Sequence, residues 1–549
     1  MREDTTRKSR ILIVLSSDSE NLSLVKIFAN LKKQGESVDI WRAKQNEQAI
    51  APFLRILDYS KILDNMDQEK FSQYSVVICG RSCYEALPLS WVLSFPGIIL
   101  ADDTAMYDGK NVYGDVVCVN GMSNLNNISK RMTFPVVFTG CIKADSAKQI
   151  NYKYFNERLY FKQNYKVHIL YVESGHFPFG KEGRLSLAKA FCTAVCEHPD
   201  KAFLVKPRFL RHEAAYGRHR NNDHLYGYIE EYFNGKLPDN LVLLEKHESM
   251  DDLVAWSDLS IYTYSSAHIE CISCGKPFFH LAGVPSVETA DFRKNRMHNL
   301  ESFMDMAGCT IPYYELSKFI EHPVLAAPEY CELLDGGQGT AVDDFCSLTL
   351  YLANLVDGNF CPTPSFCYLS GDLINTVQNP RKLRIQRLKG YITYKTCLFE
   401  NRFDNYSLLD LWLDEIEEPE LLAMNNEQLC EWVDDWLDKK VMDIIDQHQS
   451  TSNVFDRAFI LRYYHETRRK KERDKMLDSY GEKDSAWYYY SAMRKLDVGA
   501  KQEAESFLKK YLYVVDQRGY ALTDAESNVH LEFAKSIVNN VGSEGMCDE

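Results

Sequence analysis

The sequence has no long apolar run and no secretion-like start, and these absences exclude two classes of protein. No apolar stretch in the 549 residues approaches the ~20 residues that a membrane-spanning helix requires. Ile11–Leu15 follows a basic start but is shorter than the roughly seven residues of a signal-peptide core, so we expect a first β-strand there. We therefore expect neither a transmembrane protein nor a secreted one.

Cysteine is present, but without the spacing that binds a metal. The 16 cysteines are scattered along the chain. Cys271 and Cys274 form a C-x-x-C, yet no second cysteine pair accompanies them. Buried, reduced thiols are therefore expected in place of zinc or disulfides, and this indicates a cytoplasmic location.

The chain also lacks an excess of basic residues. Its formal net charge is −15 at pH 7, which argues against general nucleic-acid binding because that function requires a basic face. A local basic pocket for a nucleotide is compatible with this charge. The composition is 45% hydrophobic and 26% charged, as in globular proteins with an ample core.

What the chain does have, over its first two thirds, is a repeated alternation of β-rich runs and helical patterns. Ile11–Leu15, Val76–Cys79 and Val136–Thr139 are such runs, and alternation of this kind implies parallel strands with right-handed crossovers. We predict an α/β fold with two Rossmann-like domains, at residues 1–150 and 151–380. The cleft between two such domains is a usual meeting place for two substrates.

From about residue 380 the pattern becomes helical and rich in aromatic residues, so residues 381–549 are predicted to form a C-terminal α-helical extension. Ser485–Val515 predicts a helix, a break at Gly499 and a second helix, similar to one tetratricopeptide-like hairpin. A solenoid needs at least about three repeats. We therefore expect the extension to pack against the core or another subunit, with a separate protein partner as the alternative.

The charged run Arg468–Lys475 lies within this extension. We expect it to form a solvated helix face. Peripheral contact with an acidic membrane surface is the weaker alternative, because the run mixes both signs of charge.

The segment Leu241–Pro277 predicts a strand, a short helix, a second strand and then a helix that opens at Tyr264-Ser265-Ser266. Ser266 is a good N-cap, and a helix N-terminus at the carboxyl end of a parallel strand is where α/β sheets hold phosphates. An ordinary α/β repeat with a serine cap is the alternative. Upstream, a strand runs into Lys206-Pro207-Arg208, whose two cations suit a diphosphate.

These motifs, in this order, resemble the GT-B glycosyltransferases of bacterial surface-polysaccharide synthesis, near the capsule transferases and the CDP-glycerol glycerophosphotransferases. The resemblance covers roughly residues 10–300 and implies a GT-B fold. It also implies transfer of a sugar from a nucleotide-sugar to a surface-glycan or lipid-linked acceptor. Residues 1–150 would then lie on the acceptor side and residues 151–380 would bind the nucleotide-sugar. The expected location is cytoplasmic, with a peripheral position at the inner face of the membrane as the alternative. The shared residues are Thr139, Gly140, Asp145, Lys206, Pro207, Asp258, Tyr264, Ser265, Ser266, Glu270, Gly275, Lys276 and Pro277.

The chain departs from this pattern in two places. Relatives commonly have Lys-x-His-Pro where this chain has Lys206-Pro207-Arg208, although Arg208 offers a bidentate fork in place of the histidine. Relatives often carry His-Gly near the end of the first domain, where this chain has Ala101-Asp102-Asp103-Thr104. The donor half of the resemblance is therefore the better guide.

In this reading the phosphates are bound at the helix start, and Lys206 and Arg208 neutralise the leaving group. Glu270 accepts hydrogen bonds from the ribose, with a favourable interaction with the helix dipole as the alternative. His176, in the loop after the strand at 167–172, is expected to contact donor phosphate or acceptor. The other donor-binding candidates are Tyr264, Ser265 and Ser266.

The catalytic base is expected in the first domain. Asp18 and Glu20 follow the first strand, Asp102 and Asp103 are rivals, and plain helix capping is the alternative role for the first pair. No D-x-D motif stands in a metal-binding context, so we predict no catalytic metal and no cofactor beyond the nucleotide-sugar co-substrate. A glycerophosphate transferase, a sugar-nucleotide epimerase and a non-catalytic assembly subunit remain alternative functions.

Overall fold

The computed structural model describes most of the chain. The described residues are 10–15, 21–42, 62–63, 65–80, 83–103, 113–119, 135–142, 145, 160–174, 178–208, 210–211, 224–263, 265, 267–287, 309–325, 340–359, 364, 369–370, 379–403, 418–448, 453–481, 483–518, 522–526 and 528–544.

The central strands of the first sheet are buried on both faces. Its eight strands lie in the order β14-β7-β6-β5-β4-β1-β2-β3, and only β14 pairs antiparallel, with β7. Every residue of β1 and β4 is buried, as expected for a parallel sheet covered by helices on each side. The strands are β1 (Ile11–Leu15), β2 (Val38–Arg42), β3 (Ile62–Leu63), β4 (Val76–Gly80), β5 (Ile98–Asp103), β6 (Val116–Val119), β7 (Val136–Phe138) and β14 (Leu369–Ser370).

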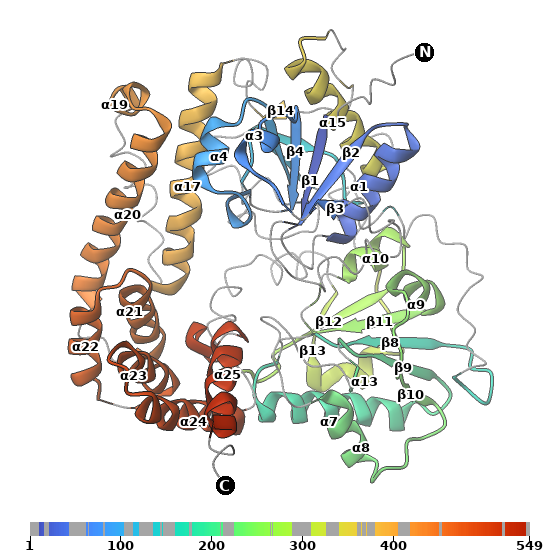
Figure 1. The fold of residues 1–549 in the computed structure, drawn as a ribbon. Helices are drawn as coiled ribbons and strands as arrows, with labels where there is room; N and C mark the ends of the chain where they lie inside the picture. The colour runs from blue at the N-terminus through green and yellow to red at the C-terminus, as the bar shows by residue number, and fades with distance from the viewer. Residues whose placement is uncertain are drawn as a thin grey trace.

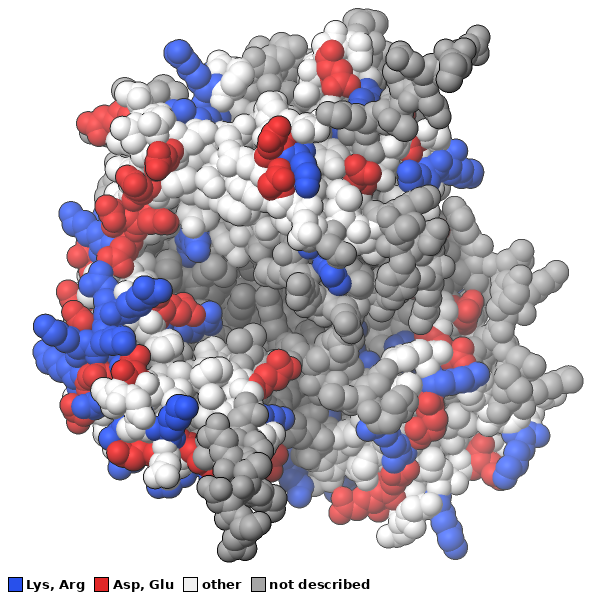
Figure 2. Space-filling model, in the orientation of Figure 1, with Lys and Arg blue, Asp and Glu red and all other residues white. Residues whose placement is uncertain are grey.

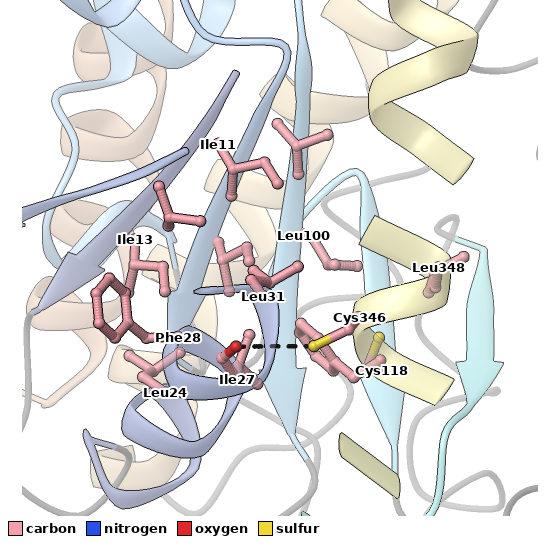
Figure 3. Close-up of a cluster of buried hydrophobic side chains, with 14 of the residues drawn as sticks. Ile11, Ile13, Leu24, Ile27, Phe28, Leu31, Leu100, Cys118, Cys346 and Leu348 are labelled. Carbon is pink, nitrogen blue, oxygen red and sulfur yellow. Dashed lines mark hydrogen bonds between the residues drawn. The ribbon is translucent and has the colours of Figure 1, made fainter. Parts of the chain in front are cut away.

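Helices cover both faces of this first sheet. On one face α1 (Asn21–Lys33) and α15 (Ala341–Val356) bury their apolar sides in a single cluster, in which Cys346 Sγ donates to the Ile27 carbonyl at 3.7 Å (Figure 3). On the other face α3 (Gln68–Phe71) and α4 (Leu89–Ser94) contribute to a second cluster with the alternate strand residues.

The second sheet has six strands, all parallel, in the order β10-β9-β8-β11-β12-β13. One face packs on α7 (Lys181–Glu197), α8 (Leu225–Tyr232) and α13 (Leu316–Phe319). The opposite face packs on α9 (Met250–Trp256) and α10 (His268–Ser273). The strands are β8 (His168–Val172), β9 (Ala202–Lys206), β10 (Leu241–Leu243), β11 (Leu259–Tyr262), β12 (Phe278–Ala282) and β13 (Thr310–Pro312).

The chain crosses back to the first sheet after the second one is complete. Helix α15 follows β13 in sequence, yet its side chains belong to the core of the first sheet. The Asp145 carboxylate fixes its start, accepting the backbone N–H groups of Ala341 at 2.9 Å and Val342 at 2.8 Å. Part of the range 151–380 therefore packs with the first domain.

The C-terminal region is helical, as predicted, and runs along one side of both lobes (Figure 1). Gly499, with φ of +75°, ends α23, and the N–H groups of Gly499 and Ala500 bond back to Leu496 and Lys495, each at 3.0 Å. This is the predicted hairpin with its break. The helices are α17 (Pro380–Phe403), α19 (Glu418–Ala423), α20 (Asn426–His448), α21 (Val454–Glu466), α22 (Lys470–Asp478), α23 (Ser485–Asp497), α24 (Lys501–Arg518) and α25 (Asn528–Glu544).

The extension packs against the first domain through α17, the first of the two alternatives expected for it. Leu93 of α4 lies in the same apolar cluster as Leu388 and Ile392 of α17. Beside this cluster, the buried guanidinium of Arg387 pairs with buried Asp115 at the start of β6. The fold class is therefore confirmed: an α/β fold with two Rossmann-like sheets and a helical C-terminal extension.

The charged run in α22 is only partly the solvated face that the sequence predicts. Lys470, Lys471 and Lys475 are exposed, but Arg473 is 1% exposed and pairs with Asp497 at 2.8 Å. Arg473 therefore points inward because an acidic partner on α23 compensates its charge. Figure 2 shows basic and acidic side chains intermixed along the edge of the extension. No helix in the described ranges is long and apolar enough to cross a membrane.

Candidate functional site

The strand order of the second sheet indicates where a ligand would bind. In sequence terms the order β10-β9-β8-β11-β12-β13 is 3-2-1-4-5-6, so the direction of winding reverses between β8 and β11. Ligands of doubly wound sheets bind outside the carboxyl ends of the strands at such a reversal. The residues that follow β8, β9 and β11 therefore define the candidate site.

Glu173, the first residue after β8, joins three segments at this edge. Its Oε1 accepts from Nη1 of Arg184 on α7 at 3.3 Å, and its Oε2 accepts from the backbone N–H of Arg208 at 3.1 Å. Its own N–H donates to the Lys206 carbonyl at 3.0 Å. The ion pair is buried, with side-chain exposures of 4% for Arg184 and 9% for Glu173. Sequence analysis missed this pair.

The two predicted cations lie on the turn that Glu173 holds. Lys206 is the half-buried last residue of β9, and Arg208 is an exposed residue two positions later. The turn therefore presents both side chains at the carboxyl edge, one strand away from the reversal point.

The start of α7 is fixed by a close backbone approach. A Cβ on Gly183 would lie 1.8 Å from the Pro285 carbonyl oxygen, so the loop after β12 touches the helix where only glycine fits. The backbone N–H of Phe179 also donates to Ser286 Oγ at 2.9 Å. This packing holds Arg184, in the first turn of α7, beside Glu173.

The predicted helix near Ser266 is present as α10, but it begins later than expected. Its N-cap is Ala267, and Ser265 Oγ accepts the Ala267 N–H at 3.3 Å. The prediction that Ser266 is the N-cap is therefore wrong, because the N-cap lies one residue later, at Ala267. Ser266 itself lies outside the described residues.

The side chains in the first turn of α10 face inward. His268 is fully buried, and its Nδ1 contacts the Ser265 carbonyl at 2.8 Å. Glu270 is 3% exposed, whereas Ser265 is half-buried. Ser265 is therefore the more accessible polar side chain of this segment, and Glu270 is buried. In Figure 1, α10 lies on the side of the second sheet that faces the first domain.

A hydrogen bond fastens α10 to β11. Tyr262 Oη lies 2.6 Å from Cys271 Sγ, and burial raises the pKa of the Cys271 thiol to about 12. Cys271 is therefore a structural thiol and not a nucleophile. Most of the described cysteines are likewise buried, and all of them are free.

Two buried hydroxyls mark the carboxyl edges of both sheets. Ser174, which follows Glu173, is 3% exposed, and Thr139, which follows β7, is fully buried. Neither hydroxyl has a hydrogen-bond partner among the residues that the structure describes. Buried polar groups normally have such partners, so these two are available to polar groups that enter the region.

Three of the motif residues that carry the resemblance have structural roles. Lys276 Nζ donates to the Ser257 carbonyl at 2.9 Å and so ends α9. Asp258 accepts the His168 N–H at 2.9 Å, at the amino edge of the sheet and away from the site. Asp145 caps α15, as described above.

On the first sheet the winding reverses between β1 and β4. Asp18 and Glu20 follow β1, so they belong to the segment at this reversal, but they lie outside the described residues. Their rival Asp102 is 3% exposed at the end of β5, with β4 between it and β1. The side chain of Asp103, and all of His176 and Tyr264, also lie outside the described residues.

Comparison with known proteins gives similar folds only. No protein-family model and no curated protein matches the chain. A putative UDP-N-acetylglucosamine 2-epimerase from Listeria monocytogenes is similar at 11% identity, with 65% of this chain and 99% of that one covered and a TM-score of 0.44. The Neisseria meningitidis UDP-GlcNAc 2-epimerase bound to UDP-GlcNAc is similar at 14% identity, 62% and 99% coverage and a TM-score of 0.43. Acinetobacter baumannii MurG is similar at 12% identity, 63% and 99% coverage and a TM-score of 0.36. With TM-scores below 0.5, these similarities carry no argument about activity.

Proposed function

We propose that this protein is a glycosyltransferase that moves a sugar from a nucleotide-sugar donor to a surface-glycan or lipid-linked acceptor. The observation that carries the proposal is the gathering of Lys206, Arg208 and the start of α10 at the carboxyl edge of the second sheet, around its reversal point. Parallel sheets of this winding bind phosphorylated ligands at that position.

The chemistry divides between the two sheets. Lys206 and Arg208 stabilise the negative charge that develops on the leaving nucleotide, while Ser265 and backbone N–H groups near α10 orient its phosphates. In this proposal Glu270, in the first turn of α10, accepts hydrogen bonds from the ribose, and Tyr264 and Ser266 belong to the same segment. The loop with His176 follows β8 at the same edge. The acceptor base is Asp18 or Glu20, which follow the reversal strand of the first sheet, and no metal takes part in this scheme.

A binding screen tests the donor half of the proposal. Thermal unfolding is measured with CMP, CDP, UDP and GDP, and a ligand present at about 100 times its dissociation constant stabilises by about 2.7 kcal/mol. Lys206→Ala and Arg208→Ala are expected to abolish most of that shift. Lys236→Ala is the matched control, because Lys236 is exposed and precedes β10 at the opposite edge of the sheet. Absence of any shift in the unaltered protein would refute nucleotide binding.

Turnover then separates transfer from the alternatives. A glycosyltransferase releases the nucleotide together with a lengthened acceptor, whereas an epimerase interconverts sugar-nucleotides without a simple release. A glycerophosphate transferase uses CDP-glycerol in place of a nucleotide-sugar. An assembly subunit binds without turnover and keeps its role in Lys206→Ala.

A further inference from the structure

Glu173 stands out because one carboxylate is shared between a helix and a turn. One oxygen accepts from the Arg184 side chain at 3.3 Å and the other from the backbone N–H of Arg208 at 3.1 Å. Both contacts are buried or half-buried, and neither follows from secondary structure. The carboxylate therefore ties the turn after β9 to the first turn of α7.

The turn needs such a tie because the pairing of β9 with β10 ends before it, and the pairing with β8 ends at Lys206. The bond from the Leu244 N–H to the Val205 carbonyl lies at the end of the β9–β10 pairing. Pro207 has no N–H to offer, and the next N–H, that of Arg208, extends beyond the ladder. Glu173 accepts this N–H and so fixes the backbone between the two cations.

Charge alone predicts the opposite effect of Glu173 on an anionic ligand. A carboxylate at this edge repels phosphate, and Arg184 compensates its charge within a buried ion pair. Removing the negative charge would leave Arg184 in excess and attract an anion more strongly. A loss of affinity in a neutral variant would therefore come from the position of the turn.

We infer that Glu173 is a positioning residue of the nucleotide site, which holds Lys206 and Arg208 in the geometry that meets the phosphates. The inference rests on the proposed function. Glu173 does not contact the ligand in this inference, and it affects binding only by fixing the turn after β9.

Glu173→Gln tests the tie directly, because the neutral amide cannot accept both donors as the carboxylate does. Hydrogen–deuterium exchange is followed in peptides that cover residues 203–211, and faster exchange is expected there in the variant. Glu321→Gln is the matched control: Glu321 forms an ion pair with Lys201 at 2.9 Å, at the amino end of β9. It should leave exchange in the 203–211 peptides unchanged.

Nucleotide affinity provides the second measurement, with the compound that gives the largest shift among CMP, CDP, UDP and GDP. Glu173→Gln is expected to raise the dissociation constant about tenfold, the scale of one lost hydrogen bond to a charged group. In a Lys206→Ala/Arg208→Ala background the same change is expected to have an effect of less than about twofold, because residues that act as a unit are not additive.

The possible results separate a failure of the Glu173 inference from a failure of the proposed function. Two results together support the inference. Glu173→Gln speeds exchange in the 203–211 peptides, and it weakens nucleotide binding in the unaltered background but not in the Lys206→Ala/Arg208→Ala background. Unchanged exchange, unchanged or tighter binding, or fully additive losses overturn it, and nucleotide binding by the unaltered protein then still supports the proposed function. If the unaltered protein binds none of the four nucleotides, both fall together.

Discussion

Arg387 and Asp115 form a bidentate ion pair across 272 positions of sequence, with Nε to Oδ1 at 2.8 Å and Nη2 to Oδ2 at 2.6 Å. The remaining guanidinium hydrogens bond the carbonyls of Val92, Phe95 and Gly97 at 2.6 to 2.8 Å. All the donors of Arg387 are therefore used, and they join the helical extension to the first domain.

Removing one partner of this ion pair is expected to destabilise the protein strongly. Arg387→Ala leaves Asp115 buried without its counter-charge and should lower the free energy of unfolding by about 3 to 5 kcal/mol. Urea denaturation followed by tryptophan fluorescence measures the loss. Lys382→Ala, an exposed change on the same helix, should have almost no effect. An Arg387→Ala variant as stable as that control would show that the pair contributes little.

Gly183→Ala is expected to disturb the candidate site through packing. The added methyl group would lie 1.8 Å from the Pro285 carbonyl oxygen, a backbone atom, so α7 and the loop after β12 must separate. We expect a loss of about 1 to 3 kcal/mol, as in overpacked cores.

Gly227→Ala on α8 is the matched control, because a Cβ there meets nothing within 4 Å. This change should be neutral or stabilising by up to about 1 kcal/mol. Equal melting temperatures for the two variants would contradict the close approach at Gly183.

His465 is expected to make the extension sensitive to acid. Burial lowers the pKa of His465 below its ordinary value of 6.5, and the positive charge of Arg473 is the second cause in order of size. The unfolded chain then binds a proton between the folded pKa and 6.5 while the folded chain does not, so stability falls as the pH drops through that window.

Chemical denaturation at pH 7.5 and 5.5 measures this dependence. The difference in unfolding free energy between the two pH values should be smaller in His465→Asn than in the unaltered protein. His322→Asn, at an exposed position, serves as the control and should keep the full difference. An unaltered pH dependence in His465→Asn would assign the acid sensitivity to other groups.

Cysteine reactivity should follow burial. Cys196 is exposed on α7, whereas Cys271 is fully buried and the pKa of its thiol is raised to about 12. Since the thiolate is the reactive form, iodoacetamide at pH 7.5 should modify Cys196 in the folded protein and leave Cys271 intact. Peptide mass spectrometry after quenching compares the two, with urea-unfolded protein as the fully reactive reference.

The fold was predictable because its signal is local. Runs such as Ile11–Leu15 are short, apolar and separated by helical patterns, so they indicate buried parallel strands wherever they occur. The break at Gly499 was equally readable, since a positive φ there requires glycine. The inward orientation of Arg473 was not, because its partner Asp497 lies at the far end of the next helix.

The candidate site was predictable only in outline, because only part of its signal is local in the sequence. The position of Lys206 and Arg208 at the carboxyl edge was predictable because both lie where a strand ends, which is a sequence-local pattern. The contacts of Glu173 with Arg184 and Arg208 join three segments, and periodicity carries no signal for such contacts. Motif order also does not reveal a local contact such as that of Lys276, which donates to the Ser257 carbonyl at the end of α9.

Asp145 has a mechanical consequence. The chain leaves the first sheet near this residue and returns to it at Ala341, and the carboxylate clips the two passages together. One buried carboxylate therefore joins two parts of the chain that lie 196 positions apart in sequence, and the start of α15 depends on it.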